Sequence, residues 1–353
     1  MTKSATRVAA DKVTFTQTEV TSAITAGDTA ARAGRKNLII NGGMQVSQRG
    51  SAVGTPASGG YSLDRFHATT VTGTGKFSVQ QTPSTTESGY ATRVAAGFND
   101  YLAVTSLSNY AIQANDIQLI TQSLEGNNVA HLGWGTSSAK TVTLSFLVRS
   151  SLTGTFGGSF RNYDNNRSFP FSYAIPVANT WTTISVTVAG DTSGTWKTDN
   201  TAGIYLSWGL GVGSTYSGSN GVWAGALDAA PSNAVSVVGT SGATFYLTGV
   251  QLETGSVATD FEHRSYGEEL SLCLRYFWRD AAIEGWFFPI NPSNNVYFRS
   301  EIYFPTIMRS SPSVSVDSSI TGTQYITNSK VSLRLNHIAS YSTWTGITVS
   351  AEL

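Results

Sequence analysis

Two runs of this chain, residues 141–148 and 180–188, alternate apolar and polar side chains with a period of two. In a β-strand this period points one set of side chains into a core and the other set toward water. Shorter strand-like runs recur between turn signals. They cover residues 77–81, 91–95, 101–104, 117–124, 154–160, 171–175 and 204–210. Many short strands separated by turns are typical of a β-sandwich, so the pattern predicts an all-β fold.

The composition agrees with an all-β fold. Only 12% of the residues are charged, whereas charged residues make up about a quarter of an average protein.

The formal charge is +0, from 22 basic and 22 acidic residues. Such a chain has no global field to hold a phosphate backbone or an anionic membrane surface. We therefore expect no nucleic-acid partner, and no membrane insertion because no apolar run is long enough to span a bilayer.

The stretch 244–278 separates two parts of the chain. Its first half, residues 245–253, has short-period alternation and predicts a strand. A Thr-Gly-Ser break follows, and the spacing of apolar residues then changes to that of a helix. Ser265 and Glu268 have the spacing of a capping box, the N-terminal signature of a helix. We therefore expect one short connecting helix over residues 265–278.

A smaller set of strand-like runs follows the predicted helix. It covers residues 285–289, 296–304, 314–316, 330–336 and 346–349. Fewer than ~80 residues make a thin core, so we expect packing between chains to stabilise this part. The predicted organisation is an N-terminal arm over 1–35, a sandwich domain over 36–264, the helix over 265–278 and a small β tip domain over 279–353.

The first 35 residues differ from the rest of the chain. They contain one aromatic residue, Phe15, and much Ala and Thr, so they cannot bury enough surface to fold alone. Two interpretations stay open, a disordered tail and an arm that becomes ordered against a partner. Val13, Val20 and Ile24 add anchors that a linker would not need, and they favour the arm. The segment lacks the apolar core of a signal peptide.

Four motifs occur in order between residues 35 and 312. They are RKNLIINGGMQVSQRG at 35–50, YSLDRF at 61–66, FYLTGVQLETGSVATDFEHRSYGEELSLCLRYF at 245–277 and an FP…MR…P pattern at 304–312. Together they resemble bacteriophage tail-fibre and virion-appendage proteins. The resemblance implies a homotrimer whose N-terminal arm docks on other virion proteins. It also implies synthesis in the host cytoplasm and a final location in the virion.

The central domain of that family resembles carbohydrate-binding modules of the jelly-roll type. In those modules the opening strand, residues 38–46 here, lies beside the closing strand, residues 245–253 here. Related modules often hold a structural Ca²⁺ through an acid just before the closing strand. Thr248 and Gly249 stand at that place in this chain, so we expect no metal and no cofactor.

Sugar recognition needs flat aromatic faces for the C–H side of the ring, with amides and carboxylates for the hydroxyls. Trp134, Trp196 and Trp223 lie in turn-rich contexts. Two interpretations stay open for them, solvent-facing contacts to a glycan and a plug over the end of the sandwich. Trp181 and Trp208 lie inside predicted strands, where we expect them in the core.

A second group of aromatic and polar residues occurs in the predicted tip domain. The candidates are Trp286, Tyr297, Arg299, Tyr341 and Trp344, with Asn294 and Asn295 nearby. They fit a distal glycan site, and they equally fit the thin core of a trimer.

Asp64 and Arg65 form an adjacent pair of opposite charges within a predicted strand. Neighbouring side chains on a strand point to opposite faces, so the two need not bond each other. We expect a buried ionic network with Arg49 or Glu253 rather than a catalytic role. Asn41, in the opening motif, is also expected to be structural.

The sequence does not favour an enzyme. A glycosidase needs two carboxylates that flank a cleft, and the few acids here occupy turn-like stretches where Asp is common. The four histidines are scattered without metal-ligand spacing. The single Cys273 can form no intrachain disulfide, and its apolar surroundings predict a small buried hydrophobe.

We therefore expect a non-enzymatic phage fibre protein that attaches the virion to host surface polysaccharide. The first alternative is a structural virion component, such as a capsid decoration, a head fibre or a tail-assembly protein, that binds no glycan. The second is a glycosidase that depolymerises host capsule.

Overall fold

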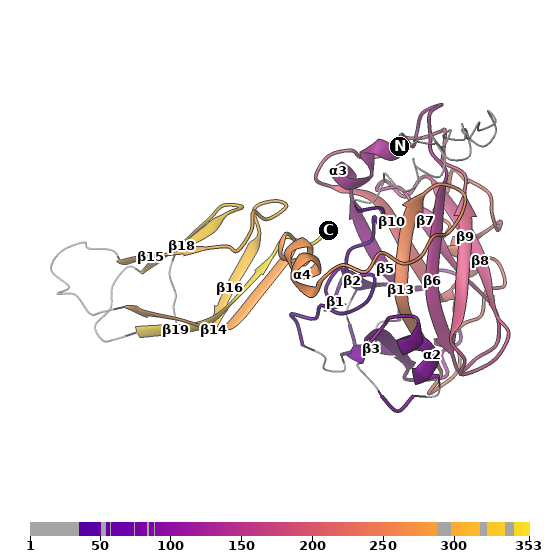
Figure 1. Cartoon of the computed structure of the whole chain (residues 1–353), viewed down its shortest axis with the longest axis horizontal. Helices are drawn as coiled ribbons and strands as arrows, with labels where there is room; N and C mark the ends of the chain where they lie inside the picture. Colours follow the sequence, from indigo (N-terminus) through magenta and orange to yellow (C-terminus); the bar gives the residue numbers. More distant parts are fainter. Residues whose placement is uncertain are drawn as a thin grey trace, which may run out of the picture. The chain divides into compact units, whose positions relative to one another are not determined.

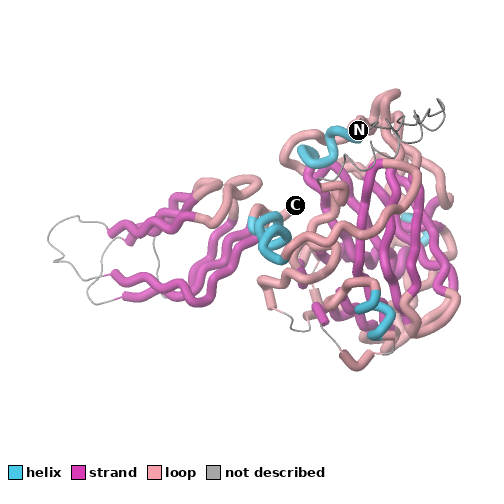
Figure 2. The backbone as a smooth tube through the Cα atoms, viewed as in Figure 1, coloured by secondary structure: helices cyan, strands magenta, loops and turns pink. Residues whose placement is uncertain are grey.

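A computed structural model describes residues 35–50, 54–56, 58–73, 75–82, 85–87, 89–287, 298–317, 323–335 and 342–353. The chain is mostly β, as predicted, and its largest part is a sandwich of two antiparallel sheets (Figures 1 and 2). Apart from Arg35, the predicted N-terminal arm lies outside the described residues.

The two sheets of the sandwich have strands that are neighbours in space but not in sequence, as in a jelly roll. The first sheet has the order β1-β2-β5-β10-β7-β8, with β1 Tyr61–Leu63, β2 Phe66–Val71, β5 Ile117–Glu125, β10 Ala202–Val212, β7 Gly154–Arg161 and β8 Ser168–Ile175. The second has the order β3-β4-β13-β6-β9, with β3 Phe77–Thr82, β4 Tyr101–Ser106, β13 Thr244–Thr254, β6 Val142–Ser150 and β9 Thr182–Val188. Between them lies a core that contains Trp208, whose ring centroid is 6.3 Å from that of Phe66 and 5.8 Å from that of Phe146. Trp181 is also buried, so both strand tryptophans lie inside as expected.

Short helices connect the strands. They are α2 Tyr90–Ala95, α3 Gly126–Val129 and α4 Tyr266–Leu274, with 3₁₀ turns η1 Ala130–Leu132 and η2 Ser214–Tyr216. Residues 91–95 form α2, so the strand predicted there is wrong. A five-residue alternation fits either a strand or a buried helical turn, and the ion pair of buried Arg93 with Glu87 at 2.8 Å stabilises the helix. None of the described helices is long and apolar enough to cross a membrane.

Helix α4 has the predicted cap. Ser265 Oγ accepts a hydrogen bond from the backbone N–H of Glu268 at 3.3 Å. The helix ends at Leu274 rather than at Trp278, and the next strand follows directly. Cys273 is fully buried on this helix and burial raises the pKa of its thiol, as expected of a small core residue.

Residues 38–46 lie beside β13, which confirms the neighbourhood that the resemblance implied. The backbone N–H of Leu38 donates to the carbonyl of Leu252 at 2.9 Å. The side chain of Asn37 adds a donor to the Val250 carbonyl at 3.1 Å and an acceptor for the Leu252 N–H at 3.0 Å. The segment is not a regular strand, because a turn interrupts it: the N–H of Met44 donates to the carbonyl of Asn41 at 2.9 Å, and both residues have a positive φ.

Two three-stranded sheets follow α4. The first has the order β14-β19-β16, with β14 Phe277–Phe287, β19 Ser342–Ser350 and β16 Ser313–Asp317; the second has the order β15-β18-β17, with β15 Phe298–Tyr303, β18 Lys330–Leu335 and β17 Thr323–Ile326. Their small core contains Ile302, Met308, Val331, Leu333 and Val349. Five of these six strands overlap the predicted runs. β17 was not predicted, and β14 begins at Phe277, within the range predicted as helix. The domain boundaries themselves stay predictions.

Residues 61–66, predicted as one strand, form a tight hairpin instead. Leu63 pairs with Phe66, and Arg65 between them has a φ of 69°, in the left-handed region. The turn aims Arg65 at a partner far along the chain, Glu352, with which it forms an ion pair. The alternation of apolar and polar residues did not reveal this reversal of the chain, because only two residues form the turn.

The predicted ionic network exists, but without Glu253. Arg49 lies 3.7 Å from Asp64 and 3.0 Å from Glu352. Of the two alternatives, Arg49 or Glu253, the structure has Arg49. Glu253 instead accepts hydrogen bonds from the N–H and hydroxyl of Thr259, in the segment that follows β13, at 2.8 and 2.6 Å.

Asn41 has the structural role that was expected. Its amide donates to the carbonyls of Val46 and Asp64 at 2.8 and 3.0 Å, and its Oδ1 accepts from the Val46 N–H at 2.9 Å. With a φ of 61° it also occupies a backbone conformation that Asn tolerates better than most residues.

Candidate functional site

The outer face of the six-stranded sheet carries a row of short polar side chains. Backbone register places His67 (β2), Thr121 (β5), Ser207 (β10) and Ser159 (β7) side by side. The hydroxyl oxygens of Thr121 and Ser207 are 3.0 Å apart. Alternate residues of the same strands, such as Trp208, fill the core. The row faces away from the sandwich core, but it is not open to solvent: Thr121, Ser207 and Ser159 are fully buried and His67 is nearly so.

Residues 213–236 cover part of this outer face, and we call them the covering segment. Within it β11 (Ser217–Gly218) pairs with β12 (Ala230–Pro231). A Cβ on Gly157 of β7 would lie only 2.3 Å from Cδ of Pro231. The close approach of β12 to the sheet thus requires the absence of a side chain at this glycine.

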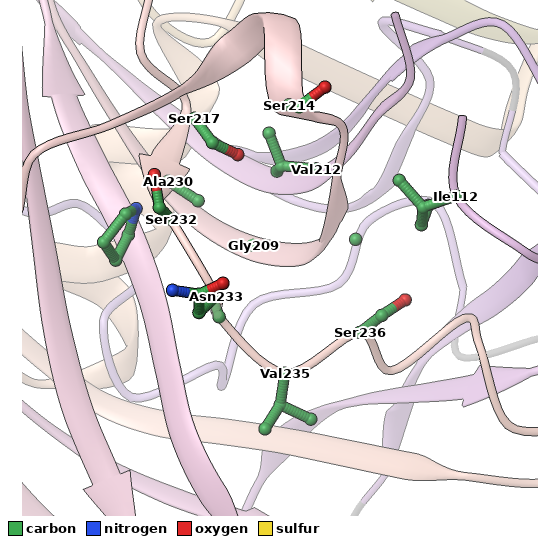
Figure 3. A pocket seen from close by; sticks show the side chains of 13 residues that line it. Ile112, Gly209, Val212, Ser214, Ser217, Ala230, Ser232, Asn233, Val235 and Ser236 are labelled. Atoms are coloured by element: carbon green, nitrogen blue, oxygen red, sulfur yellow. The ribbon is translucent and has the colours of Figure 1, made fainter. Parts of the chain in front are cut away.

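The covering segment and β10 enclose a pocket of about 350 Å³, shown in Figure 3. We call it the serine pocket; it is lined by Ile112, Gly209, Gly211, Val212, Ser214, Ser217, Ala230, Pro231, Ser232, Asn233, Ala234, Val235 and Ser236. None of these residues is charged or aromatic. The hydroxyl of Ser236 is buried and has no hydrogen-bond partner among the described residues. The pocket can bond a neutral polar group, but it offers no flat ring against which a sugar could stack.

A pair of tyrosines lies at the opposite end of β10. Tyr205, half-buried on β10, and Tyr163, in the turn between β7 and β8, have ring centroids 6.4 Å apart and an interplanar angle of 23°. Tyr163 is 43% exposed. We call the two rings the tyrosine platform. The exposed part of Tyr163 offers an aromatic ring of the kind that sugars contact, and the polar row lies on the same face of the sheet as Tyr205.

Charged groups surround the tyrosine platform. Lys197 Nζ is 5.5 Å from the centroid of the Tyr163 ring and 3.6 Å from the carboxylate of Asp164. The guanidinium carbon of Arg161 lies 5.6 Å from the centroid of the Tyr205 ring. Burial, together with the nearby cations Arg65 and Arg161, lowers the pKa of His67 to about 4. His67 is therefore neutral near pH 7.

The structure brings the three loop tryptophans together in one edge-to-face cluster. Ring centroids of Trp134 and Trp196 are 4.8 Å apart, and Trp223 is 5.4 and 5.6 Å from them. Trp134 and Trp196 are only 7% and 9% exposed, so the expectation of solvent-facing rings is wrong for these two. Each indole N–H of the cluster donates to a backbone carbonyl. The cluster matches the alternative interpretation, a plug, because three large rings exclude water best by packing on one another.

The candidate residues of the predicted tip domain stay predictions. Tyr297 and Tyr341 lie outside the described residues. Trp286 (β14), Arg299 (β15) and Trp344 (β19) have described backbones but not described side chains. In the described part of the same sheets, Tyr303 and Tyr325 are exposed on β15 and β17.

The platform residues were not among the residues that the sequence singled out. Tyr163 lies in the polar turn Asn-Tyr-Asp-Asn-Asn-Arg, and an exposed aromatic in such a turn is a usable local signal. Tyr205 and Arg161 lie in strands, where a large side chain is first taken as core. Only the pairing of β10 with β7, in which Tyr205 lies opposite Arg161, brings them to Tyr163.

Comparison with known proteins gives structural similarities alone. No protein-family model matches the sequence, and no curated protein matches it. One similar chain is the enzymatically active domain of tailspike protein 4 of bacteriophage CBA120, at 12% identity and a TM-score of 0.33. The similarity covers 62% of this chain and 22% of that one.

Carbohydrate-binding modules are also similar to this chain. TmCBM61, solved with β-1,4-galactotriose, has 8% identity and a TM-score of 0.31, over 63% of this chain and all of that one (100%). The family 11 module of a cellulosomal cellulase of Clostridium thermocellum has 14% identity and a TM-score of 0.27, over 59% of this chain and 99% of that one. All three TM-scores are below 0.5.

Proposed function

We propose that this chain is a non-enzymatic virion fibre protein that binds host surface glycans through the tyrosine platform. The observation that carries the proposal is the stacked, partly exposed pair Tyr163 and Tyr205, with the exposed ion pair of Lys197 and Asp164 beside the Tyr163 ring. Aromatic faces bind the C–H side of a sugar, and hydroxyl, amide and carboxylate groups bond its polar edge. The exposed turn after β7 supplies both kinds of group, the ring of Tyr163 and the carboxylate of Asp164.

The assignment to a virion is supported by the four ordered motifs and by the roles of their residues in the fold. The opening motif lies against the closing strand. In the FP…MR…P pattern, Arg309 donates to the carbonyls of Asn200 at 2.6 Å and Ala351 at 2.8 Å. The motif thus joins the sandwich to the end of the chain. A shared joining role is a physical reason for the motifs to occur together.

We further propose a homotrimer, with residues 1–35 as the arm that docks on other virion proteins and residues 279–353 as the tip domain. A single platform offers a small contact area. Three copies held in one particle component would multiply weak sugar contacts by raising the effective concentration of the second and third sites. The mass of the purified protein in solution tests the trimer, and a stable monomer would contradict it.

The substitution Tyr163→Ala tests the glycan site. We expect binding of the preferred polysaccharide to weaken roughly fivefold or more per site, because about 1 kcal/mol of aromatic contact is lost. Isothermal titration calorimetry against a panel of bacterial surface polysaccharides measures the affinity. The matched control is Tyr266→Ala, which removes an exposed tyrosine of α4 and should leave binding unchanged.

The same panel separates the alternatives. If Tyr163→Ala binds the polysaccharide as tightly as the parent protein does, the tyrosine platform is not the glycan site. A folded protein that responds to no polysaccharide would favour the structural virion component. Release of reducing ends from a capsule polysaccharide would favour the depolymerase.

A further inference from the structure

Among the described residues, the guanidinium group of Arg161 is a buried cation without a carboxylate partner, next to the tyrosine platform. From this we infer that the platform recognises an acidic saccharide, one that carries a carboxylate or a sulfate. The inference rests on the proposed glycan binding and names the ligand class of that same site.

Arg161 makes fewer bonds than a buried guanidinium needs. Its Nη1 donates to Asn165 Oδ1 at 2.8 Å and its Nη2 donates to Ser207 Oγ at 3.2 Å. Its Nε has no hydrogen-bond partner among the described residues, although the side chain is only 5% exposed. The hydroxyl of Ser159, on the same face of β7, also has none. Two unpartnered polar groups thus lie at the end of β7 that meets the platform.

Three other arginine side chains that are buried in the described residues have carboxylate partners. Arg65 pairs with Glu352, Arg93 with Glu87 at 2.8 Å and Arg264 with Glu269 at 3.4 Å. Since an unpaired buried charge is costly, this pairing is what stability requires. Arg161 has only neutral acceptors, so its positive charge remains available to a ligand.

Burial lowers the pKa of Arg161 to about 10, which shows the cost of the charge but leaves the group cationic near pH 7. The charged groups around the platform are Arg161, Lys197 and Asp164. The carboxylate of Asp164 neutralises one of the two cations. One positive charge is left over, beneath a ring that would contact the sugar.

An acid group on the bound sugar would supply the missing negative charge. Charge attraction is strong at this place because the guanidinium is largely removed from water. It also persists without direct contact, since a carboxylate placed on the Tyr205 ring would lie within several ångström of the guanidinium. Neutral sugars could use the same rings but would gain nothing from Arg161.

The test compares each acidic polysaccharide with its own carboxyl-reduced form. The probes are polygalacturonate, alginate, hyaluronan and polysialic acid, titrated calorimetrically into the full chain at about 10 mM ionic strength, where the Debye length is about 30 Å. We expect at least one acidic form to bind about tenfold or more tighter than its reduced form. The preference should shrink at about 0.15 M salt, where screening is stronger.

Two variants assign the preference to these charges. Arg161→Gln keeps a donor for Ser207 but removes the charge, and it should bring the acidic and reduced forms to within about twofold of each other. Asp164→Asn removes a carboxylate from an exposed turn and should raise the preference for the acidic form. Because Asp164 is exposed, this second variant gives an answer even if Arg161→Gln does not fold. Tyr266→Ala is the control, and we expect it to bind the acidic and the reduced forms as the parent protein does.

Equal binding of acidic and reduced forms by the parent protein would overturn the inference and leave the proposed glycan binding standing. The inference would also be overturned if both Arg161→Gln and Asp164→Asn prefer the acidic form as strongly as the parent protein does. The preference would then come from charges elsewhere. Binding of neither form by the folded protein would remove the proposed function and the inference together.

Discussion

At the scale of single residues, several polar side chains on the outer side of the six-stranded sheet are buried. His67 is 8% exposed, and its Nε2 lies 3.2 Å from the hydroxyl of Ser123. Its ring also packs near Tyr61, with centroids 5.0 Å apart. An imidazole in such a place is kept neutral by desolvation and by the cations beside it. The protonation of one side chain should therefore affect the stability of the whole sandwich.

We predict that His67 makes the fold sensitive to mild acid. Burial lowers its pKa from an ordinary 6.5 to about 4 in the folded chain. The unfolded chain thus binds the proton first, so the free energy of unfolding is undiminished above pH 6.5 and falls as the pH drops from 6.5 to 4. The loss approaches about 3 kcal/mol at the lower end. Urea denaturation at a series of pH values measures the slope.

The variant His67→Gln serves as the comparison. It cannot titrate in this range, so its stability curve should be flatter between pH 6.5 and 4. A difference in the free energy of unfolding that does not depend on pH is measured at pH 8, where the imidazole is neutral in the folded and the unfolded chain. The same steep slope in His67→Gln would show that another group causes the acid sensitivity.

At the scale of elements, glycines set how closely the covering segment approaches the sheet. Gly157 lies under Pro231 of β12, and Gly209 of β10 lies under Ala230, whose Cβ is 3.5 Å from the position that a Gly209 Cβ would take. Leu227 and Ala229 of the same segment pack with Leu119 on β5. One strand-like segment therefore covers part of the outer face and forms one wall of the serine pocket.

We predict that Gly157→Ala destabilises the protein by about 1–3 kcal/mol. The new methyl group would lie 2.3 Å from Pro231 Cδ, so the proline ring must move and β12 with it. Guanidinium denaturation measures the change. Gly225→Ala is the matched control because it lies in the covering segment and a Cβ there has nothing within 4 Å; its effect should stay within about 0.5 kcal/mol.

A loss in Gly157→Ala no larger than that in Gly225→Ala would show that β12 moves freely on the sheet. The serine pocket would then not be a fixed cavity. With the expected difference, the pocket wall is held by packing against the glycine.

At the scale of the molecule, the end of the chain joins the C-terminal sheets to the sandwich. Glu352 pairs with Arg49 and Arg65, and Tyr61 donates its hydroxyl hydrogen to the carbonyl of Leu353 at 2.9 Å. The guanidinium of Arg65 also lies 3.5 Å from the centroid of the Tyr276 ring. The two arginines thereby lie against aromatic rings and share the carboxylate of Glu352, while Arg49 also pairs with Asp64.

We predict that Glu352→Gln costs about 3–5 kcal/mol, because it leaves the fully buried Arg65 without a counter-charge. The parent protein and the variant are compared by urea denaturation at pH 7 and by limited proteolysis of the C-terminal sheets. Glu301→Gln is the control. It breaks an ion pair with Lys330 at 2.9 Å whose side chains are 30% and 31% exposed, which should cost no more than about 1 kcal/mol. Equal effects of the two substitutions would contradict a special role for the chain end.

The sequence by itself determined the all-β class, most of the strands and the cap of α4. These features are local, since alternation, turn residues and the Ser265–Glu268 spacing act over a few residues. It also led to the neighbourhood of residues 38–46 and β13, through the resemblance of ordered motifs.

Only the tertiary structure decided which side chains meet. Trp134 and Trp196 became core because Trp223 packs across both rings. The partner of Arg65 is 287 residues away, and Glu253 took a different role although its charge was suitable. The tyrosine platform exists because β7 pairs with β10. Such contacts depend on the folded arrangement of distant segments, and no local pattern of residues encodes which distant segments become neighbours.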